Sequence, residues 1–339
     1  GLEEFAAEEP AARLAHARYY LDVLSRANSL YLEGSQRSLE GLALFDREVR
    51  EIRAAWEWIC GGSAPADGVA ERARLELRAR YPAVFTNLMP LRLLPEERVD
   101  WLAAGLAAAG SLGDRPLEVI LVSSLGTGYY VMERNREALA CQLQALSIAL
   151  ALAREPGGDC LPLARVLGNL GALYRVTGQR QRALRYFSKE LELARRLGDL
   201  REEGRALGGL GRVYFDMGDM PRAIEFFQAE LQVAESTGDR RGQAIALGGL
   251  GNACRLLKEY DRAREYLERD LAITLEIGDR RGQAGASWML GKVYHDQGDL
   301  ASAVRWMQAL VDYEREVGHR AAEWRAETVA EIQARMLGE

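Results

Sequence analysis

The sequence has few helix-breaking residues and no long apolar run. Only nine of its 339 residues are proline, a residue that removes a backbone donor and interrupts helices. No stretch of about 18 apolar residues occurs, which excludes an ordinary membrane-spanning helix. The first ten residues are acidic rather than basic and then apolar, so they do not read as a signal peptide. These absences favour a helical chain that folds in water.

Lysine is also scarce, whereas arginine is abundant. The chain carries 44 Lys and Arg against 50 Asp and Glu, a formal net charge of −6, which argues against wholesale nucleic-acid binding. Cys60, Cys141, Cys160 and Cys254 form no C-x-x-C pair, and this favours a reducing, cytoplasmic setting with unbridged thiols. Because the chain begins with Gly1 rather than Met, we expect a piece of a longer protein.

What the sequence does contain is a repeat with a step of 40 residues. A run Leu-Gly-x-Leu-Gly-x-x-Tyr begins at Leu167 and at Leu207, and related runs begin at Leu247 and Ser287. An earlier copy, around Leu125, lies 45 residues before the corresponding residues of the next copy. Within each unit, apolar residues recur at three- and four-residue spacing, which predicts two helices. Such pairs bury their apolar faces only by stacking, so the repeat predicts an all-α solenoid.

Small residues keep the same step, and each kind has its own expected place. The two small-residue columns are Gly171, Gly211, Gly251, Gly291 and Ala183, Ala223, Ala263, Ala303. We expect them where the two helices of a pair touch, because a larger side chain would hold the helices apart. Pairs such as Gly218-Asp219 and Gly318-His319 are expected at turns, where Gly ends one helix and Asp caps the next.

These runs resemble the tetratricopeptide repeat (TPR) family. The likeness is to its longer variety of about 40 residues, as in LGN/Pins-type adaptors and the C-terminal TPR sensors of bacterial STAND/NB-ARC-type signalling ATPases. It is strong over residues 114–318 and weak over 68–113. The resemblance implies a right-handed α-α superhelix that binds a protein or peptide and is not an enzyme.

The expected organisation has four parts. They are an N-terminal helical hairpin or junction at 1–67, a degenerate TPR-like pair at 68–113, the TPR array at 114–318 and a capping helix at 319–339. The repeats of the array are expected at about 114–158, 159–198, 199–238, 239–278 and 279–318, following the step. A loop is expected at 61–65. The sequence around His16 and Glu48 resembles the junction that follows the nucleotide-binding part of bacterial signalling ATPases, so an upstream nucleotide-binding module is suspected.

In the capping helix, four apolar residues are expected to cover the open end of the stack. They are Trp324, Val329, Ile332 and Met336.

No set of residues for catalysis, a cofactor or a metal emerges. The glycines of Gly208-Gly209-Leu210-Gly211 recur inside predicted helices, and G-x-x-x-x-G-K-[ST] is absent, so a phosphate loop is not expected. The three histidines share no metal-like spacing with one another or with a cysteine. Glu190, Glu230 and Asp270 recur at the repeat step and are expected on a solvated face.

The resemblance implies that the first helix of each pair lines a concave groove. By column, the candidate partner-binding residues are Ser123, Thr127, Tyr130, Arg165, Asn169, Arg175, Arg205, Arg212, Phe215, Asn252, Arg255, Trp288, Lys292 and His295. Gly168, Gly208 and Gly248 are expected to form a shallow floor where a ligand backbone can lie close.

Two interpretations of this groove stay open. Six of the candidates are basic, which suits a partner with carboxylates held by Arg forks and Asn side chains, with binding that weakens as salt rises. Alternatively, these arginines pair with Glu and Asp on neighbouring helices. The expected role is a ligand sensor or scaffold of a larger signalling protein. A peptide-pheromone-type sensor domain of a transcription regulator and a free-standing LGN-like adaptor are the alternatives. RNA is disfavoured because few aromatic side chains lie in these columns.

Overall fold

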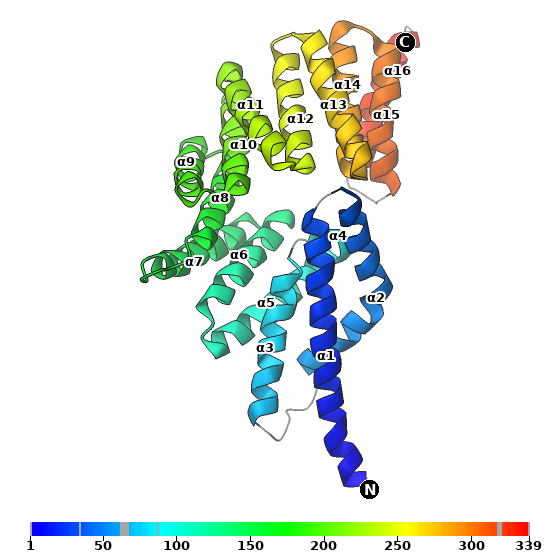
Figure 1. The fold of residues 1–339 in the computed structure, drawn as a ribbon. Coiled ribbons are helices and arrows are strands. Elements are labelled where there is room, and N and C mark those ends of the chain that lie inside the picture. Colours follow the sequence, from blue (N-terminus) through cyan, green and yellow to red (C-terminus); the bar gives the residue numbers. More distant parts are fainter. Residues whose placement is uncertain (1, 34, 62–67, 87, 317–320, 338–339) are drawn as a thin grey trace. The chain divides into compact units, whose positions relative to one another are not determined.

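In the computed structural model, residues 2–33, 35–61, 68–86, 88–316 and 321–337 are described. All regular structure in these residues is helical (Figure 1), and this confirms the all-α fold class. The chain divides into two compact units, Gly1–Lys189 and Glu190–Glu339. The boundary falls within one helix, α9 (Arg180–Leu197).

The first unit begins with two long helices, α1 (Leu2–Glu33) and α2 (Ser35–Gly61), which pack against each other as a hairpin. The other helices of this unit before α9 are α3 (Gly68–Val84), α4 (Met89–Arg92), α5 (Pro95–Leu112), α6 (Arg115–Val131), α7 (Asn135–Ala153) and α8 (Leu161–Val176). Of the loop expected at 61–65, residue 61 ends α2 and residues 62–65 lie outside the described part of the chain.

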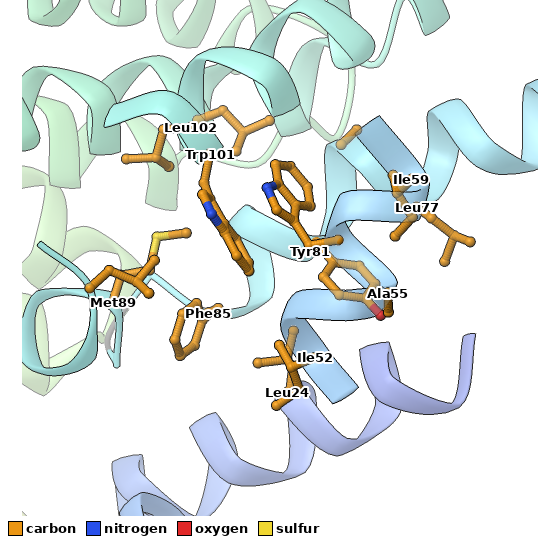
Figure 2. Close-up of a cluster of buried hydrophobic side chains, with 14 of the residues drawn as sticks. Leu24, Ile52, Ala55, Ile59, Leu77, Tyr81, Phe85, Met89, Trp101 and Leu102 are labelled. Carbon is orange, nitrogen blue, oxygen red and sulfur yellow. The ribbon is translucent and has the colours of Figure 1, made fainter. Parts of the chain in front are cut away.

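Aromatic side chains attach the hairpin to the helices that follow it. The ring of Trp56 on α2 stacks on Trp101 of α5, with ring centroids 4.4 Å apart. The buried hydroxyl of Tyr81 on α3 donates to the Ala17 carbonyl of α1 at 2.8 Å. Figure 2 shows Tyr81, Phe85 and Trp101 converging with aliphatic side chains of α1 and α2 in one cluster. Stacked aromatic pairs contribute about 1 kcal/mol beyond their buried area, so the hairpin is part of this core.

The second unit is a regular series of helix pairs. After the end of α9, its helices are α10 (Leu200–Asp216), α11 (Met220–Thr237), α12 (Arg240–Leu256), α13 (Tyr260–Glu276), α14 (Arg280–Gln297), α15 (Leu300–Glu316) and α16 (Ala322–Leu337). From α10 onward, each helix packs on the next. Among the first helices, α12 also contacts both α10 and α14 directly, so the three form one layer.

The small-residue columns lie where the helices of a pair meet. A Cβ added at Gly211 would lie 2.7 Å from the ring of Phe227, and one at Gly251 would lie 2.5 Å from Leu267. Both distances are too short for real carbon contacts, so the paired helix could not keep its position beside alanine. The expectation that these glycines sit at helix contacts is confirmed.

The turns between helices follow the predicted chemistry. Gly218 has a positive φ of 82°, and the Asp219 carboxylate accepts a hydrogen bond from the backbone N–H of Arg222 at 3.2 Å. In the next repeat Lys258 takes the place of the turn glycine and also has a positive φ, 62°. The last copy of the turn, at 318–319, lies outside the described residues.

The last helix, α16, buries a different stripe from the expected one. Val329 and Ile332 are buried as predicted, but Trp324 is 62% exposed and Met336 is also exposed. The prediction is therefore wrong for Trp324 and Met336. The reason is that α16 turns Arg325 inward, where its guanidinium ion-pairs with a buried glutamate of α15.

Candidate binding surface

The candidate residues fall into two sets, one in each compact unit. In the second unit they lie on the first helices, and we call the exposed side of α10, α12 and α14 the first-helix face. It carries Arg205, Arg212, Phe215, Ile245, Asn252, Arg255, Leu256, Lys292 and His295.

On α10, Arg205 pairs with its own neighbours. Its Nη2 atom lies 2.6 Å from Oε1 of Glu190 and 2.7 Å from Oε2 of Glu202. Both glutamates are buried. Burial raises the pKa of Glu190, and the guanidinium of Arg205 opposes that rise. For Arg205 the structure therefore agrees with the alternative in which arginines pair with acidic residues of neighbouring helices.

The acidic column of the second helices is buried, which corrects the expectation of a solvated face. Glu190, Glu230 and Asp270 are only 0%, 5% and 8% exposed. Burial raises the pKa of Glu230 and of Asp270 to about 7. The carboxylates of Glu230 and Asp270 point toward the paired first helix, and that of Glu190 lies beside Arg205 of α10.

The expected glycine floor is occupied by those carboxylates. A Cβ on Gly208 would collide with the carboxylate of Glu230, and one on Gly248 would lie 3.0 Å from Oδ2 of Asp270. Gly208 is itself buried. The absence of a Cβ thus makes room for an acid of the paired helix, and the interpretation of Gly208 and Gly248 as a floor for a ligand is wrong.

At the centre of the face, α12 and α14 are joined by a polar network. Nε of Arg255 donates to Oδ1 of Asn252 at 3.2 Å, and its Nη1 donates to Oδ2 of Asp296 at 2.5 Å. Nδ1 of His295 lies 3.4 Å from Oδ1 of Asp296. The network holds the Arg255 guanidinium in one orientation through its Nε and Nη1 atoms.

Two exposed aliphatic residues on α12 escaped the sequence analysis. Ile245 and Leu256 are each 46% exposed, and they lie seven residues before and four residues after Asn252, on the same side of the helix. The same columns hold arginine and aspartate on α10, and glycine and aspartate on α14. Because equivalent positions in successive repeats hold both apolar and charged residues, comparing the repeats did not reveal these two side chains.

Trp288 does not lie on the exposed face. It is 7% exposed and belongs to the hydrophobic cluster formed with Met307, Val329 and Ile332. The guanidinium carbon of Arg325 lies 5.6 Å from the centre of its ring. The expectation of an accessible groove tryptophan is wrong because α16 covers the ring.

The other candidates of this unit are partly accessible. Arg212 and Phe215 on α10 and Lys292 on α14 are half-buried. The charge of Arg212 opposes the rise in the pKa of Glu230. Burial lowers the pKa of Lys292, and the nearby charges of Arg255 and Arg325 lower it further.

In the first unit, Ser123 and Asn169 belong to an internal polar network. Oγ of Ser123 donates to Oε1 of Gln142 and accepts from Nδ2 of Asn169, both at 3.0 Å. Thr127 donates to the Ser123 carbonyl at 3.1 Å. Ser123 is buried, contrary to the expectation of an exposed binding residue, because Gln142 of α7 and Asn169 of α8 enclose it. Gln142 was not anticipated from the sequence.

The remaining candidates of the first unit are more open. Tyr130 and Arg175 are half-buried, and Arg165 is exposed. They stay candidates for partner contact.

In the part of the chain that the structure describes, no three His, Cys, Asp or Glu side chains gather in a way that could hold a metal ion. The glycine-rich run 208–211 lies inside α10, which agrees with a packing role rather than a phosphate loop. Nor is any described helix long and apolar enough to cross a membrane.

Several solved structures share this fold at low sequence identity. A Rap protein in complex with Competence and Sporulation Factor is 14% identical, with coverage of 98% of this chain and 99% of that one and a TM-score of 0.58. NprR in complex with its cognate peptide NprX is 15% identical, with coverage of 92% and 84% and a TM-score of 0.58.

A third neighbour is a Signal Transduction ATPase with Numerous Domains (STAND) protein with a tetratricopeptide repeat sensor, from Pyrococcus horikoshii. It is 19% identical, with a TM-score of 0.59, and 98% of this chain matches half of that protein. No curated protein sequence matches the chain. At these identities, likeness to solved structures establishes the fold alone.

The family is established by sequence. The model of the tetratricopeptide repeat family matches residues 117–196, 202–276 and 242–316. The matches cover more than half of the chain and coincide with the helix pairs from α6 to α15. The TPR fold is generally non-catalytic, and no enzymatic family is indicated. The chain belongs to the tetratricopeptide repeat family.

Proposed function

We propose that this chain binds a protein or peptide with carboxylate groups through the first-helix face. The observation that carries the proposal is the arrangement on α12, where Asn252 and Arg255 lie between the exposed side chains of Ile245 and Leu256. At 1.5 Å per residue these aliphatic side chains are about 16 Å apart along the helix, the span of about five extended residues. Two apolar anchors with an amide and a guanidinium between them suit an extended acidic segment.

The fold neighbours support this role. Among them, the Rap protein is complexed with Competence and Sporulation Factor and NprR with its cognate peptide. The STAND protein has its tetratricopeptide repeats as a sensor. We therefore propose a ligand sensor or scaffold of a larger cytoplasmic signalling protein, with a nucleotide-binding module upstream in the same polypeptide. The NprR complex equally supports a peptide-pheromone-type sensor domain, and a free-standing LGN-like adaptor would use the same face.

Substitutions on α12 test the binding surface. Peptides would be selected from a random displayed library against the natural chain, and their affinities measured for Ile245→Glu and Leu256→Glu. We expect each variant to weaken binding at least about tenfold, because a charge replaces an apolar anchor, and we expect binding to weaken as salt rises.

The matched control is Leu275→Glu, which changes an exposed leucine on the second helix α13. It is expected to leave the affinity unchanged. Equal affinities for Ile245→Glu and Leu275→Glu would remove the α12 face from the proposal. Arg205 is a poor test position, because its reversal to Glu would place a third carboxylate beside Glu190 and Glu202.

A further inference from the structure

Three helices bring basic side chains to α14, which is the first helix of the last pair. Lys292 lies on α14 one turn after Trp288 and one turn before Asp296. From α12, Arg255 reaches the Asp296 end of this stretch and bonds its carboxylate at 2.5 Å. From α16, Arg325 reaches the Trp288 end and lies over the indole ring. Lys292 is therefore flanked by a guanidinium on each side.

Each arginine of this cluster is ion-paired with one carboxylate. Asp296 accepts from Arg255, and Glu314 of α15 accepts from Arg325. The cluster therefore contains two acidic and three basic side chains, and His295 lies beside Asp296. The cluster carries an excess of about one positive charge.

The surroundings of Lys292 oppose its own charge. Burial lowers the pKa of its ammonium, Arg255 and Arg325 lower it further, and Asp296 partly compensates. Holding like charges together in a half-buried place is unfavourable unless an anion joins them. Both arginines are held in place by other side chains, Arg255 by Asn252 and Asp296 and Arg325 by Glu314.

We propose that Lys292, Arg255 and Arg325 form an anion-binding subsite that takes one carboxylate of the bound partner. The inference rests on the proposed function and adds the place of the acidic group, at the last repeat and its capping helix. A carboxylate carries one negative charge, which matches the excess of the cluster, whereas a phosphate monoester carries about −1.5 to −2 at neutral pH. The partner's carboxylate is either a side chain of Asp or Glu or the chain terminus.

The scarcity of lysine provides a direct test. The chain has only Lys189, Lys258 and Lys292, and the first two are exposed, so they serve as internal controls. Acetic anhydride would be added in brief pulses, and acetylation at each lysine measured by mass spectrometry. The probes are N-acetylalanine for a terminal carboxylate, N-acetylaspartic acid α-amide for a side-chain carboxylate, N-acetylalaninamide as the neutral control, and inorganic phosphate.

A bound carboxylate is expected to slow acetylation of Lys292 alone. Each pKa unit by which the anion raises the pKa of Lys292 lowers its reactive neutral fraction about tenfold. Protection by either carboxylate probe, with none by the neutral amide, supports the subsite, and the stronger carboxylate identifies the source. Equal effects on all three lysines, or none on Lys292, would overturn it. Stronger protection by phosphate would also overturn the assignment to a carboxylate.

Two variants test the subsite, and two outcomes separate it from the proposed function. Arg255→Gln is expected to reduce the protection of Lys292 at least about threefold, because it removes one of the cations, whereas Lys258→Gln leaves it unchanged. If library-selected peptides require Ile245 and Leu256 yet leave Lys292 unprotected, the subsite fails and the proposed function stands. If the carboxylate probes protect Lys292 but binding ignores Ile245 and Leu256, the proposed function fails and the subsite stands.

Discussion

At the scale of single residues, glycine has two separate roles in this chain. At the turns, as in Gly218, it supplies a positive φ that other residues adopt only with strain. Inside the first helices, as in Gly208, it leaves space for the side chain of a paired helix. Because the two roles fail in different ways, substitutions distinguish them.

Lys258 is a residue in the first of these roles without being glycine. Its φ of 62° lies in the left-handed region, which costs a non-glycine residue about 1 kcal/mol. We expect Lys258→Gly to raise the free energy of unfolding by about 0.5–1 kcal/mol, measured by denaturant titration. Gly218→Ala at the corresponding turn is the opposite control and is expected to destabilise. A loss of stability in Lys258→Gly would contradict the strain argument.

Gly208 tests the second role. We expect Gly208→Ala to destabilise by about 1–2 kcal/mol, because the new methyl forces the buried carboxylate of Glu230 to shift. Gly204→Ala on the same helix is the control, since its Cβ would make an ordinary 3.4 Å contact with Val233. The helix preference for alanine favours that variant. A double-mutant cycle with Glu230→Ala checks the pair, and additive effects would show that the collision is unimportant.

At the scale of elements, the second helices place acids against the first helices. For Glu230 the folded pKa is about 7 against an ordinary value of 4.5, and Asp270 behaves alike. A raised carboxyl pKa means that the folded state holds the proton more tightly. The contribution of these two carboxyls to stability is therefore greatest below the unfolded pKa and falls as pH rises to about 7.

Denaturant titrations between about pH 5 and pH 7.5 check this sign. We expect the natural chain to lose stability as pH rises through this window. The double variant Glu230→Gln, Asp270→Asn is expected to lose less, because neither amide titrates. An unchanged pH dependence in the double variant would show that these carboxyls do not titrate in the window.

The last helix, α16, offers a comparison between two neighbouring residues. Arg325 pairs with the buried Glu314, so we expect Arg325→Ala to cost about 3–5 kcal/mol by leaving that acid uncompensated. Trp324 is exposed, and Trp324→Ser is expected to cost less than about 0.5 kcal/mol. Hydrogen exchange of α15 and α16 measures both. Faster hydrogen exchange of α16 in Trp324→Ser than in Arg325→Ala would support the buried stripe that was expected from the sequence.

At the scale of the whole chain, the sequence predicted the fold better than the binding surface. The fold was readable because packing requires small residues where helices touch, and Gly211 and Gly251 mark those contacts at a fixed step. The burial of Glu230 could not be predicted in the same way, since an acid that recurs every 40 residues is equally compatible with a solvent-exposed face. The glycine opposite it, Gly208, was the available signal. Ile245 depended on local exposure, which no repeat column records.

The central claim is that a partner lies on the first helices of the second unit. Its most direct test is hydrogen exchange of the full chain with and without a library-selected acidic peptide. We predict slower exchange in α10, α12 and α14, greatest around Asn252, with little change on α11 and α13. Protection confined to α11 and α13, or to the helices of the first unit, would contradict the claim.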